Sequence, residues 1–516
     1  MLKFTNETYL DFTNPEIAKQ QKDAINFVRS QFGKEYPNII NGKESRTEKK
    51  TLSTNPANPS EIVGTFQKAG QKEANEAIEA AAKAFESWKT TTAEVRANYL
   101  FRAAEEIRKR RLEINAWMIS EIGKNYLEAD ADTCEAIDFL EFYGREAIRY
   151  AQPQPLTEFP NELNEYFYIP LGVGLVIPPW NFPFAIMAGI TTAAIVTGNT
   201  VVMKPASDTP MMAWLLVDIF KKVGLPDGVL NFLVASGAEA GDYLVDHPKT
   251  RFISFTGSKE VGLRIFERAN KVSPGQIWIK RVVAEMGGKD GMIVDSEANL
   301  DEAAAGITAA AFGFGGQKCS ACSRAIVDEK IYDEFVAKLK ENVEKFTAGI
   351  GDPVDNPTMG PCANKGQFET VKEYIEIGKK EGKLLIGGKL IDNKNNGFFV
   401  EPTVFIDVAP TARIMQEEIF GPVLAVCKVK NYDEALDVAN NTEFGLTGGV
   451  WTLNPHKIER AKREFHCGNL YINRKCTGAM VDVHPFGGFN MSGTCSKAGS
   501  RDYLALFLQG KSVASR

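Results

Sequence analysis

Cys319 has the setting in this chain that best suits nucleophilic chemistry. It lies in the run Gly-Gly-Gln-Lys-Cys-Ser-Ala-Cys-Ser-Arg, residues 315–324, whose small side chains would let a substrate approach closely. We expect Lys318 and the polar neighbours to favour the thiolate, which is the reactive form of cysteine. Taken alone, the run also fits an unreactive cysteine buried in a packed segment of small residues. Its interpretation therefore depends on the groups that accompany it.

Six further motifs accompany this run. Four lie upstream, namely Pro-Pro-Trp-Asn-Phe-Pro (178–183), Met-Lys-Pro-Ala (203–206), Phe-Thr-Gly-Ser (255–258) and Glu-Met-Gly-Gly-Lys (285–289). Two lie downstream, namely Glu-Glu-Ile-Phe-Gly-Pro-Val (417–423) and Pro-Phe-Gly-Gly (485–488). In this order and spacing the chain resembles the aldehyde dehydrogenase superfamily, from about residue 38 to about residue 510. The resemblance implies that Cys319 is a catalytic nucleophile.

Oxidising an aldehyde to an acid needs a nucleophile, donors for a negatively charged oxygen, a hydride acceptor and a base that activates water. The resemblance implies that the side-chain amide of Asn181 and the backbone N–H of Cys319 are the donors. It implies that Glu285 is the base, and its apolar flanks are expected to raise its pKa toward the working range. On residue type alone, Asn181 also fits a turn residue, and Glu285 a strand-end carboxylate bonded to backbone. A hydrolytic base argues against transfer of the acyl group to coenzyme A.

A nicotinamide cofactor, NAD with NADP accepted as well, is implied by the resemblance rather than by a dinucleotide-binding fingerprint. No G-x-G-x-x-G follows a predicted strand, and Gly172-Val173-Gly174 lacks the third glycine. In the family's own loop, here residues 257–262, a helix N-terminus faces the pyrophosphate. The residues implied to bind the cofactor are Pro179, Trp180, Lys204, Ser207, Gly257, Ser258, Gly262, Glu418 and Phe420.

Ser207 departs from the family pattern. Lys204 would bond the adenosine ribose and Glu418 the nicotinamide ribose, with Phe420 beside it. Many NAD-specific relatives carry Glu three residues after that lysine, where a carboxylate bonds the 2'-hydroxyl and repels a 2'-phosphate. Because serine does neither strongly, we expect weak selection of NAD over NADP.

Two segments narrow the aldehyde to an acidic semialdehyde. Residues 272–281, an extra stretch ahead of Glu285, and residues 475–481 resemble the 1-pyrroline-5-carboxylate dehydrogenase branch, which acts on glutamate γ-semialdehyde. In that branch a hydroxyl and the backbone amides of a turn, which form an anion nest, grip the substrate's α-carboxylate. His484 stands where many relatives have Gln, without a predicted consequence. The residues implied to bind the substrate are Ser320, Gly478 and Ala479 around the carboxylate, and Phe182 and Phe486 along the aliphatic chain.

The leading hypothesis is NAD-dependent oxidation of L-glutamate γ-semialdehyde to L-glutamate through a cysteine thiohemiacetal and a thioester, the second step of proline degradation. A dehydrogenase for another acidic semialdehyde, such as succinate semialdehyde, is the near alternative. The cofactor motifs argue against a cofactor-free thiol hydrolase, and the intact catalytic set argues against a non-catalytic protein. The resemblance implies a homodimer or larger homo-oligomer. It leaves open whether a proline dehydrogenase partner hands over the pyrroline.

The composition limits the remaining possibilities. A chain of 516 residues, 44% of them hydrophobic, can bury a large core and is expected to form more than one domain. A net charge of -6 without a long run of like charge argues against nucleic acid as a partner. The eight cysteines include one C-x-x-C pair, Cys319 and Cys322, and the four histidines are scattered. No metal site is therefore expected.

The chain carries no recognisable address for export or for a membrane. Its N-terminus has neither a basic region followed by an apolar stretch nor an Arg/Ser-rich composition. The longest apolar stretch, residues 182–196, is shorter than the roughly 18 residues that a bilayer span needs. Scattered free cysteines suit a reducing compartment. We therefore expect a cytoplasmic protein.

Apolar periodicity predicts an α/β fold with a doubly wound parallel sheet. Residues 73–150 are expected to be helical, and short apolar runs then alternate with amphipathic stretches, which indicates βαβ units. A helix over residues 210–223 is expected to be capped by Ser207 or Asp208. The further elements predicted from residue 171 onward are strands at 171–177, 200–203, 229–234, 252–255 and 291–294 and a helix at 303–314.

We expect three parts in the chain. A cofactor-binding domain takes residues 1–150 and 171–287, a catalytic domain residues 288–490, and a small β oligomerisation flap residues 151–170 and 491–516. Residues 503–508 form an apolar run that we predict as a strand without an obvious partner in its own chain. In the resembled family the two pieces of the flap pair across subunits, which would cover an aggregation-prone edge.

Overall fold

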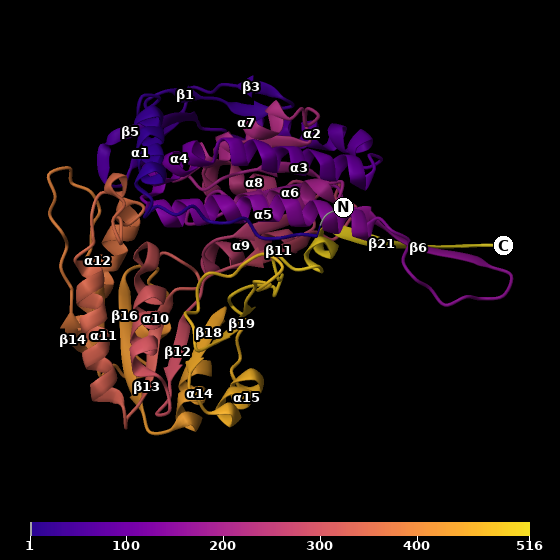
Figure 1. Cartoon of the computed structure of the whole chain (residues 1–516). Coiled ribbons are helices and arrows are strands. Elements are labelled where there is room, and N and C mark those ends of the chain that lie inside the picture. Colours follow the sequence, from indigo (N-terminus) through magenta and orange to yellow (C-terminus); the bar gives the residue numbers. More distant parts are fainter. Residues whose placement is uncertain (1–2) are drawn as a thin grey trace.

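The protein consists of two α/β bodies and a two-stranded arm (Figure 1). The computed structural model describes residues 3–516. In Figure 1 the first body, indigo to magenta, lies above the second, which is mostly orange, and the arm extends away from both. Each body contains a seven-stranded sheet with helices on both faces, so the predicted α/β class is confirmed.

The first sheet has the strand order β11-β10-β7-β8-β9-β2-β3, and its strands from β11 to β9 run parallel. The strands are β2 (Asn38–Ile40), β3 (Lys43–Ser45), β7 (Val173–Ile177), β8 (Thr200–Met203), β9 (Leu230–Phe232), β10 (Thr250–Thr256) and β11 (Arg281–Glu285). One face packs on α2 (Gln71–Trp88), α8 (Asp242–Asp246) and α9 (Lys259–Ala269). The other face packs on α3 (Ala93–Lys109), α4 (Arg111–Ile122), α5 (Tyr126–Tyr150), α6 (Ala185–Val196) and α7 (Pro210–Lys222). Helix α1 (Pro15–Arg29) packs on α4, and a small sheet is formed by β1 (Glu35–Tyr36), β4 (Lys50–Asn55) and β5 (Asn58–Gln67).

The second sheet has the order β14-β15-β16-β13-β12-β18-β19, and all of its neighbours are parallel except β14 with β15. The strands are β12 (Asp290–Val294), β13 (Cys322–Asp328), β14 (Lys383–Ile386), β15 (Thr403–Ile406), β16 (Val423–Val429), β18 (Thr447–Trp451) and β19 (Asn469–Ile472). The helices are α10 (Leu300–Phe312) and α11 (Tyr332–Thr347) on one face, and α12 (Lys365–Glu381), α13 (Arg413–Gln416), α14 (Tyr432–Asn440) and α15 (Pro455–Glu464) on the other. A short pair, β17 (Phe444–Gly445) and β20 (Phe489–Asn490), lies outside the sheet. None of the described helices has the length and apolar content that a bilayer span requires.

The predicted central strands are confirmed to within a few residues. Strands such as β8 and β12 are buried on both faces, which explains why apolar runs without alternation marked them. The predicted cap of α7 is wrong. Thr209, not Ser207 or Asp208, precedes this helix, and the Thr209 side chain makes no capping bond. Pro210 opens the first turn instead, where its missing N–H costs no hydrogen bond.

The arm corrects the prediction for the C-terminus. Strands β6 (Leu163–Pro170) and β21 (Leu508–Ser515) pair antiparallel within the same chain. The apolar run predicted as a strand at residues 503–508 is mostly a 3-10 helix, Tyr503–Phe507. Its side chains enter the core, where the Tyr503 ring stacks on Tyr143 with centroids 5.5 Å apart. The run is apolar because it is buried against α5, not because it forms a sheet edge.

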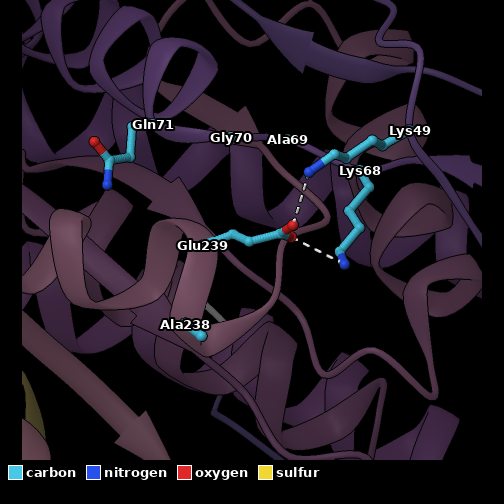
Figure 2. A pocket seen from close by; sticks show the side chains of 7 residues that line it. All are labelled: Lys49, Lys68, Ala69, Gly70, Gln71, Ala238 and Glu239. Atoms are coloured by element: carbon cyan, nitrogen blue, oxygen red, sulfur yellow. Dashed lines mark hydrogen bonds and ion pairs between the residues drawn. The ribbon is translucent and has the colours of Figure 1, made fainter.

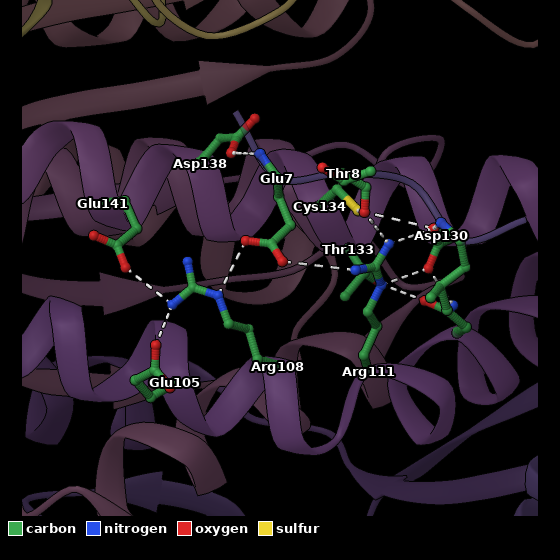
Figure 3. A network of polar contacts seen from close by, with 12 residues as sticks. Glu7, Thr8, Glu105, Arg108, Arg111, Asp130, Thr133, Cys134, Asp138 and Glu141 are labelled. Atoms are coloured by element: carbon green, nitrogen blue, oxygen red, sulfur yellow. Dashed lines mark hydrogen bonds and ion pairs between the residues drawn. The ribbon is translucent and has the colours of Figure 1, made fainter. Parts of the chain in front are cut away.

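The N-terminal segment crosses α3 and α5 and is held there by charged side chains (Figure 3). Arg108 donates to the Glu7 carboxylate at 3.0 Å, and the Glu7 backbone N–H donates to Asp138 at 2.7 Å. Arg111 donates through two nitrogens to Asp130, at 2.7 and 2.6 Å. Because Asp130 is fully buried, this bidentate pair fixes α4 on α5, and the N-terminal segment is bound to the pair where the N–H of Leu10 donates to Asp130 at 2.8 Å.

Candidate active site

The predicted catalytic residues meet where the chain passes from β11 of the first sheet to β12 of the second. The connection contains Gly287 and Gly288. A Cβ atom at Gly287 would collide with the carboxylate of Glu418, and one at Gly288 with the carbonyl oxygen of Cys319. Two consecutive glycines thus allow both groups to lie against the crossing chain.

Cys319 lies in the irregular stretch between α10 and β13, and its side chain is partly exposed. The pKa of its thiol is raised well above the ordinary value, first by burial and then by three carboxylates, Asp290, Glu418 and Glu285. The predicted effect of Lys318 is wrong, because its ammonium pairs with Glu128 at 3.4 Å. The thiol is therefore protonated in this arrangement and needs a base within reach to react.

Asn181 lies in the loop after β7 and is 4% exposed. Its Nδ2 donates to the carbonyl oxygen of Gln317 at 3.0 Å, two residues before Cys319. Gln317 is itself fixed, since its Oε1 accepts from the backbone N–H of Ala363 at 2.8 Å. One amide hydrogen of Asn181 uses this contact, and the second is left to donate to an oxygen at Cys319.

Glu285 ends β11, and its carboxylate accepts three hydrogen bonds. The donors are the Ser496 hydroxyl at 2.5 Å, the Gly488 N–H at 3.1 Å and the Ser496 N–H at 3.2 Å. Burial nevertheless raises the pKa of Glu285 to about 7. Glu285 is thus a strand-end carboxylate bonded to backbone, and its pKa is in the range that suits a base at neutral pH.

Lys204 follows β8 and lies against the single-turn π-helix Gly237–Gly241, where a Cβ atom on Gly241 would be 3.6 Å from its Cε. Its ammonium donates to the carbonyl of Pro205 at 3.3 Å, the one hydrogen bond that it makes to the described part of the chain. Burial lowers the pKa of Lys204 to about 8. A buried amine with one long hydrogen bond fits a site that ribose hydroxyls would complete. Ser207 lies nearby in sequence and is exposed.

The predicted pyrophosphate loop is the start of α9. The Ser258 hydroxyl caps this helix by accepting from the N–H of Val261 at 3.4 Å. The N–H of Gly257 donates to the carbonyl of Glu285 at 3.1 Å, and a Cβ atom at Gly262 would collide with the side chain of Met286. Gly262 therefore lets α9 pack closely on the chain just after β11, and the backbone of Gly257 is bonded to the end of that strand.

The remaining predicted cofactor residues bridge the two bodies. Glu418 accepts from the N–H of Gly288 at 2.9 Å, and burial raises its pKa to about 7. The ring of Phe420 meets Trp180 edge-on, with centroids 5.2 Å apart. Pro179, next to Trp180, is buried. The structure thus brings the loop after β7 against the segment before β16.

The predicted substrate residues lie in separate segments, two of which are joined by a direct contact. The carbonyl of Ser320 accepts from Cys476 Sγ at 3.3 Å, which joins the nucleophile's neighbour to the segment of Gly478 and Ala479. Gly478 has φ +79° and is exposed at a turn. The backbone of Phe486 forms two hydrogen bonds with that of Ala498. Gly488, which donates to Glu285, lies two residues after Phe486.

Two groups behind the site carried no signal in the sequence. Ser496 contacts Glu285 across 211 residues of chain. Lys124 is buried, pairs with Asp132 at 2.6 Å and places its ammonium 4.0 Å from the ring centroid of Phe182. A cation over an aromatic face is attractive, so Lys124 fixes the ring predicted to flank the substrate.

A surface hollow of about 310 Å³ lies at the start of α2, beside the π-helix Gly237–Gly241 (Figure 2). Lys49 and Lys68 both pair with Glu239, at 3.2 and 2.9 Å. Hydrogen bonds from Lys68, Ser236 and Lys49 lower the pKa of Glu239 to about 2. The charges of the hollow are thus paired with one another, and it adds nothing to the catalytic arrangement.

Comparison with known proteins gives a consistent result. A model of the aldehyde dehydrogenase family matches residues 43–513. The chain is 55% identical over 512 residues to a 1-pyrroline-5-carboxylate dehydrogenase of Geobacillus sp. (strain WCH70), covering 99% of each protein. Among solved structures it is similar to the 1-pyrroline-5-carboxylate dehydrogenase from Thermus with bound NAD, with a TM-score of 0.98, 49% identity and coverage of 100% and 99%. It also matches proline utilization A from Bdellovibrio bacteriovorus, with a TM-score of 0.97 and 44% identity, over 99% of this chain and 53% of that one.

Proposed function

The chain belongs to the aldehyde dehydrogenase family, and from this premise we propose that it oxidises L-glutamate γ-semialdehyde, formed from 1-pyrroline-5-carboxylate, to L-glutamate with NAD. The observation that carries the proposal is the convergence at one place of a partly exposed thiol, a buried amide donor and a carboxylate with a pKa of about 7. These groups are Cys319, Asn181 and Glu285. The similarity to a 1-pyrroline-5-carboxylate dehydrogenase, which extends over nearly the full length of both proteins, supports glutamate semialdehyde among the possible aldehydes.

The reaction begins with attack of the Cys319 sulfur on the aldehyde carbon. Because the pKa of this thiol is raised, it must lose its proton as it attacks, and Glu285 is near enough for its charge to act on the sulfur. With a pKa of about 7, the Glu285 carboxylate can take that proton directly or through one water. The product is a thiohemiacetal whose oxygen carries the negative charge.

That oxygen is stabilised by donors already in place. The free amide hydrogen of Asn181 and the backbone N–H of Cys319 are the proposed pair. Gln317 holds the Asn181 side chain, so little reorganisation is needed as charge develops. A bound nicotinamide would supply the hydride acceptor, and loss of hydride from the thiohemiacetal would leave a thioester on Cys319.

Water then cleaves the thioester. Glu285, after releasing the thiol's proton to solvent, removes a proton from the water as it attacks the acyl carbon. The carbon–sulfur bond then breaks, Glu285 returns this proton to the Cys319 sulfur, and L-glutamate leaves. The three hydrogen bonds to Glu285 hold its carboxylate beside the site while burial keeps its basicity high. The same residue thus serves both the acylation and the hydrolysis.

The cofactor would be held along the carboxyl ends of the first sheet, where parallel α/β sheets bind ligands. Lys204 would bond the adenosine ribose, the N-terminus of α9 would face the pyrophosphate, and Glu418 would bond the nicotinamide ribose beside Phe420. The buried amine of Lys204, which has one long hydrogen bond, supports this placement.

The substrate's α-carboxylate would be bound by the Ser320 hydroxyl and the N–H groups of Gly478 and Ala479. The left-handed backbone at Gly478 supports this proposal, because such a turn can direct successive N–H groups to one point. The rings of Phe182 and Phe486 would flank the aliphatic chain. A shorter acid such as succinate semialdehyde would not span from Cys319 to this turn as well.

A substrate panel tests the proposed function. Purified enzyme with NAD is given glutamate semialdehyde, succinate semialdehyde and propanal, and NADH formation is followed by absorbance. We expect the highest kcat/KM for glutamate semialdehyde, because only this substrate fills both the thiol site and the carboxylate turn. A higher kcat/KM for succinate semialdehyde would replace the proposed substrate by the shorter acid.

Four further features are part of the proposal. The exposed arm of β6 and β21 suits a homodimer or larger homo-oligomer, because an isolated two-stranded ribbon is marginally stable in water. All eight cysteines are free, which suits the cytoplasm.

The reaction needs a source of 1-pyrroline-5-carboxylate, so a proline dehydrogenase is the proposed partner activity. The two sheets support the division of the chain near residue 288 into cofactor-binding and catalytic domains.

A further inference from the structure

The turn proposed to bind the substrate carboxylate is held from behind by one guanidinium group. Arg474 Nη2 donates to the carbonyl oxygen of Thr477 at 3.1 Å and, more weakly, to that of Gly478 at 3.4 Å. The guanidinium also lies 4.7 Å from the ring centroid of Tyr471, at the end of β19. Arg474 is thus fixed on the body of the protein and reaches two successive peptide groups of the turn.

These contacts determine where the N–H groups of the turn point. In a trans peptide the C=O and the following N–H point in opposite directions. When Arg474 binds the carbonyls of Thr477 and Gly478, the N–H groups of Gly478 and Ala479 are therefore directed away from Arg474. The positive charge behind these peptides also polarises them, which strengthens N–H donation to an anion.

His484 in turn contacts Arg474. Its Nε2 lies 3.2 Å from Arg474 Nη1, and its Nδ1 lies 3.3 Å from the backbone N–H of Met480, the residue after Ala479. Both neighbours are donors. A neutral imidazole offers one acceptor nitrogen, so it accepts from one of them, whereas an imidazolium offers none. Protonation would therefore remove the accepted hydrogen bond and place two cations side by side.

We infer that Arg474 is a positioning residue that orients the carboxylate-binding turn, and that protonation of His484 loosens this orientation. The inference rests on the proposed function, since it assumes that the turn binds the substrate's carboxylate. It predicts an enzyme whose preference for acidic aldehydes is strongest when His484 is neutral and weakens as the pH falls.

The direction of the pH effect follows from the groups that face His484. Burial and the charge of Arg474 lower the pKa of His484 below its ordinary value of 6.5. The other titratable group against its ring is Tyr471, at 5.9 Å between centroids, and burial raises the pKa of that phenol to about 12, so it stays neutral. His484 is thus neutral above pH 6.5, and its support of the turn is lost as the pH falls below that value.

The test compares glutarate semialdehyde with propanal. Glutarate semialdehyde carries a carboxylate at the position of the glutamate α-carboxylate but has no amine, so it cannot cyclise. The ratio of kcat/KM for the two aldehydes is measured between about pH 5.5 and about pH 8, where His titrates and the carboxylate does not. Titration of Glu285 acts on both aldehydes and cancels in the ratio.

Arg474→Lys keeps the positive charge but loses the planar guanidinium that lies on the Tyr471 ring while its Nη2 donates to both carbonyls, so the turn is no longer held in one orientation. We expect kcat/KM for glutarate semialdehyde to fall about tenfold, mostly through KM, and that for propanal to change less than about twofold. The matched control is Arg501→Gln, which removes an exposed cation that lies 3.6 Å from Asp482 behind the same segment. It should leave the ratio unchanged.

For His484→Gln, an amide keeps an acceptor and a donor but does not titrate. We expect the wild-type ratio to fall about threefold or more from pH 8 to pH 5.5, and the variant's ratio to stay flat. An equal fall in both proteins would overturn the role of His484. Equal losses on both aldehydes in Arg474→Lys would overturn the orientation of the turn. A wild-type enzyme without preference for glutarate semialdehyde at pH 8 would instead overturn the proposed carboxylate site itself, and the inference with it.

Discussion

Replacement of Ser496 by alanine should move the pH dependence of catalysis upward. The Ser496 hydroxyl is the closest of the three donors to the Glu285 carboxylate, at 2.5 Å, and it lowers a pKa that burial has raised to about 7. A hydrogen bond to a charged group is worth about 1.5–3 kcal/mol, and one pKa unit corresponds to about 1.4 kcal/mol. Since two backbone donors remain, we take the lower limit, so that the pKa of Glu285 rises by about one unit.

The assay is the pH profile of kcat with propanal, which avoids any effect on the carboxylate turn. Activity requires the ionised base, so the rising limb should move from about pH 7 to about pH 8. At pH 7 half of the wild-type base and about a tenth of the variant's base would be ionised, so the rate should fall about fivefold. At high pH the two proteins should reach the same plateau.

The control is Ser500→Ala, in the same C-terminal segment. The Ser500 hydroxyl accepts from the N–H of Asp502 at 3.3 Å, and its loss should leave the rising limb in place. A limb that stays at the same pH in Ser496→Ala would show that the hydroxyl does not stabilise the carboxylate. A limb that moves to lower pH would refute the assignment of Glu285 as the titrating base.

Four further outcomes are expected. Cys319→Ala should abolish NADH formation while leaving NAD binding intact by calorimetry; full activity would show that Cys322 or another group is the nucleophile. Glu285→Gln should slow both steps but deacylation more, because the thiol can still lose its proton to solvent whereas the attacking water has no other base, so a burst of about one NADH per enzyme should precede slow turnover in stopped flow; an unchanged steady-state rate contradicts this. Ser207→Glu should lower kcat/KM for NADP more than for NAD, since like charges repel; a parent enzyme inactive with NADP removes the premise. Ser320→Ala should cost about ten- to a hundredfold in kcat/KM for glutamate semialdehyde and spare propanal; equal losses would mean that the hydroxyl acts on the thiol.

The sequence predicted the sheets well because most strands are buried on both faces. Apolar runs such as Thr200–Met203 are too short for a helix of ordinary size. In an α/β protein such a run forms a strand that is buried on both faces of the sheet. The run at residues 503–508 is equally apolar, but its six residues fit a strand and a short 3-10 helix equally well. It forms a 3-10 helix because Tyr503 stacks on Tyr143, a contact that no local pattern reveals.

The same limit separates the predicted and the unpredicted parts of the site. Asn181, Glu285 and Cys319 stand in motifs whose residue types already suggest their chemistry. The effect assigned to Lys318 was wrong because Glu128, 190 residues away, takes its ammonium. Ser496 is likewise 211 residues from the carboxylate that it binds. Local sequence identifies the reacting groups, whereas the groups that set their pKa come from distant segments.

The connection between the two sheets explains why these distant segments meet. Gly287 and Gly288 link β11 to β12, and the absence of a side chain at each admits Glu418 and the backbone of Cys319. Glu285 ends β11, one residue before Met286, whose N–H donates to the carbonyl of Ser492 at 2.8 Å. This hydrogen bond holds the C-terminal segment at the end of β11, which places the Ser496 hydroxyl at the Glu285 carboxylate. The basicity of Glu285 and the position of the nucleophile are thus determined by one crossing of the chain, so that any shift of one body against the other must alter both.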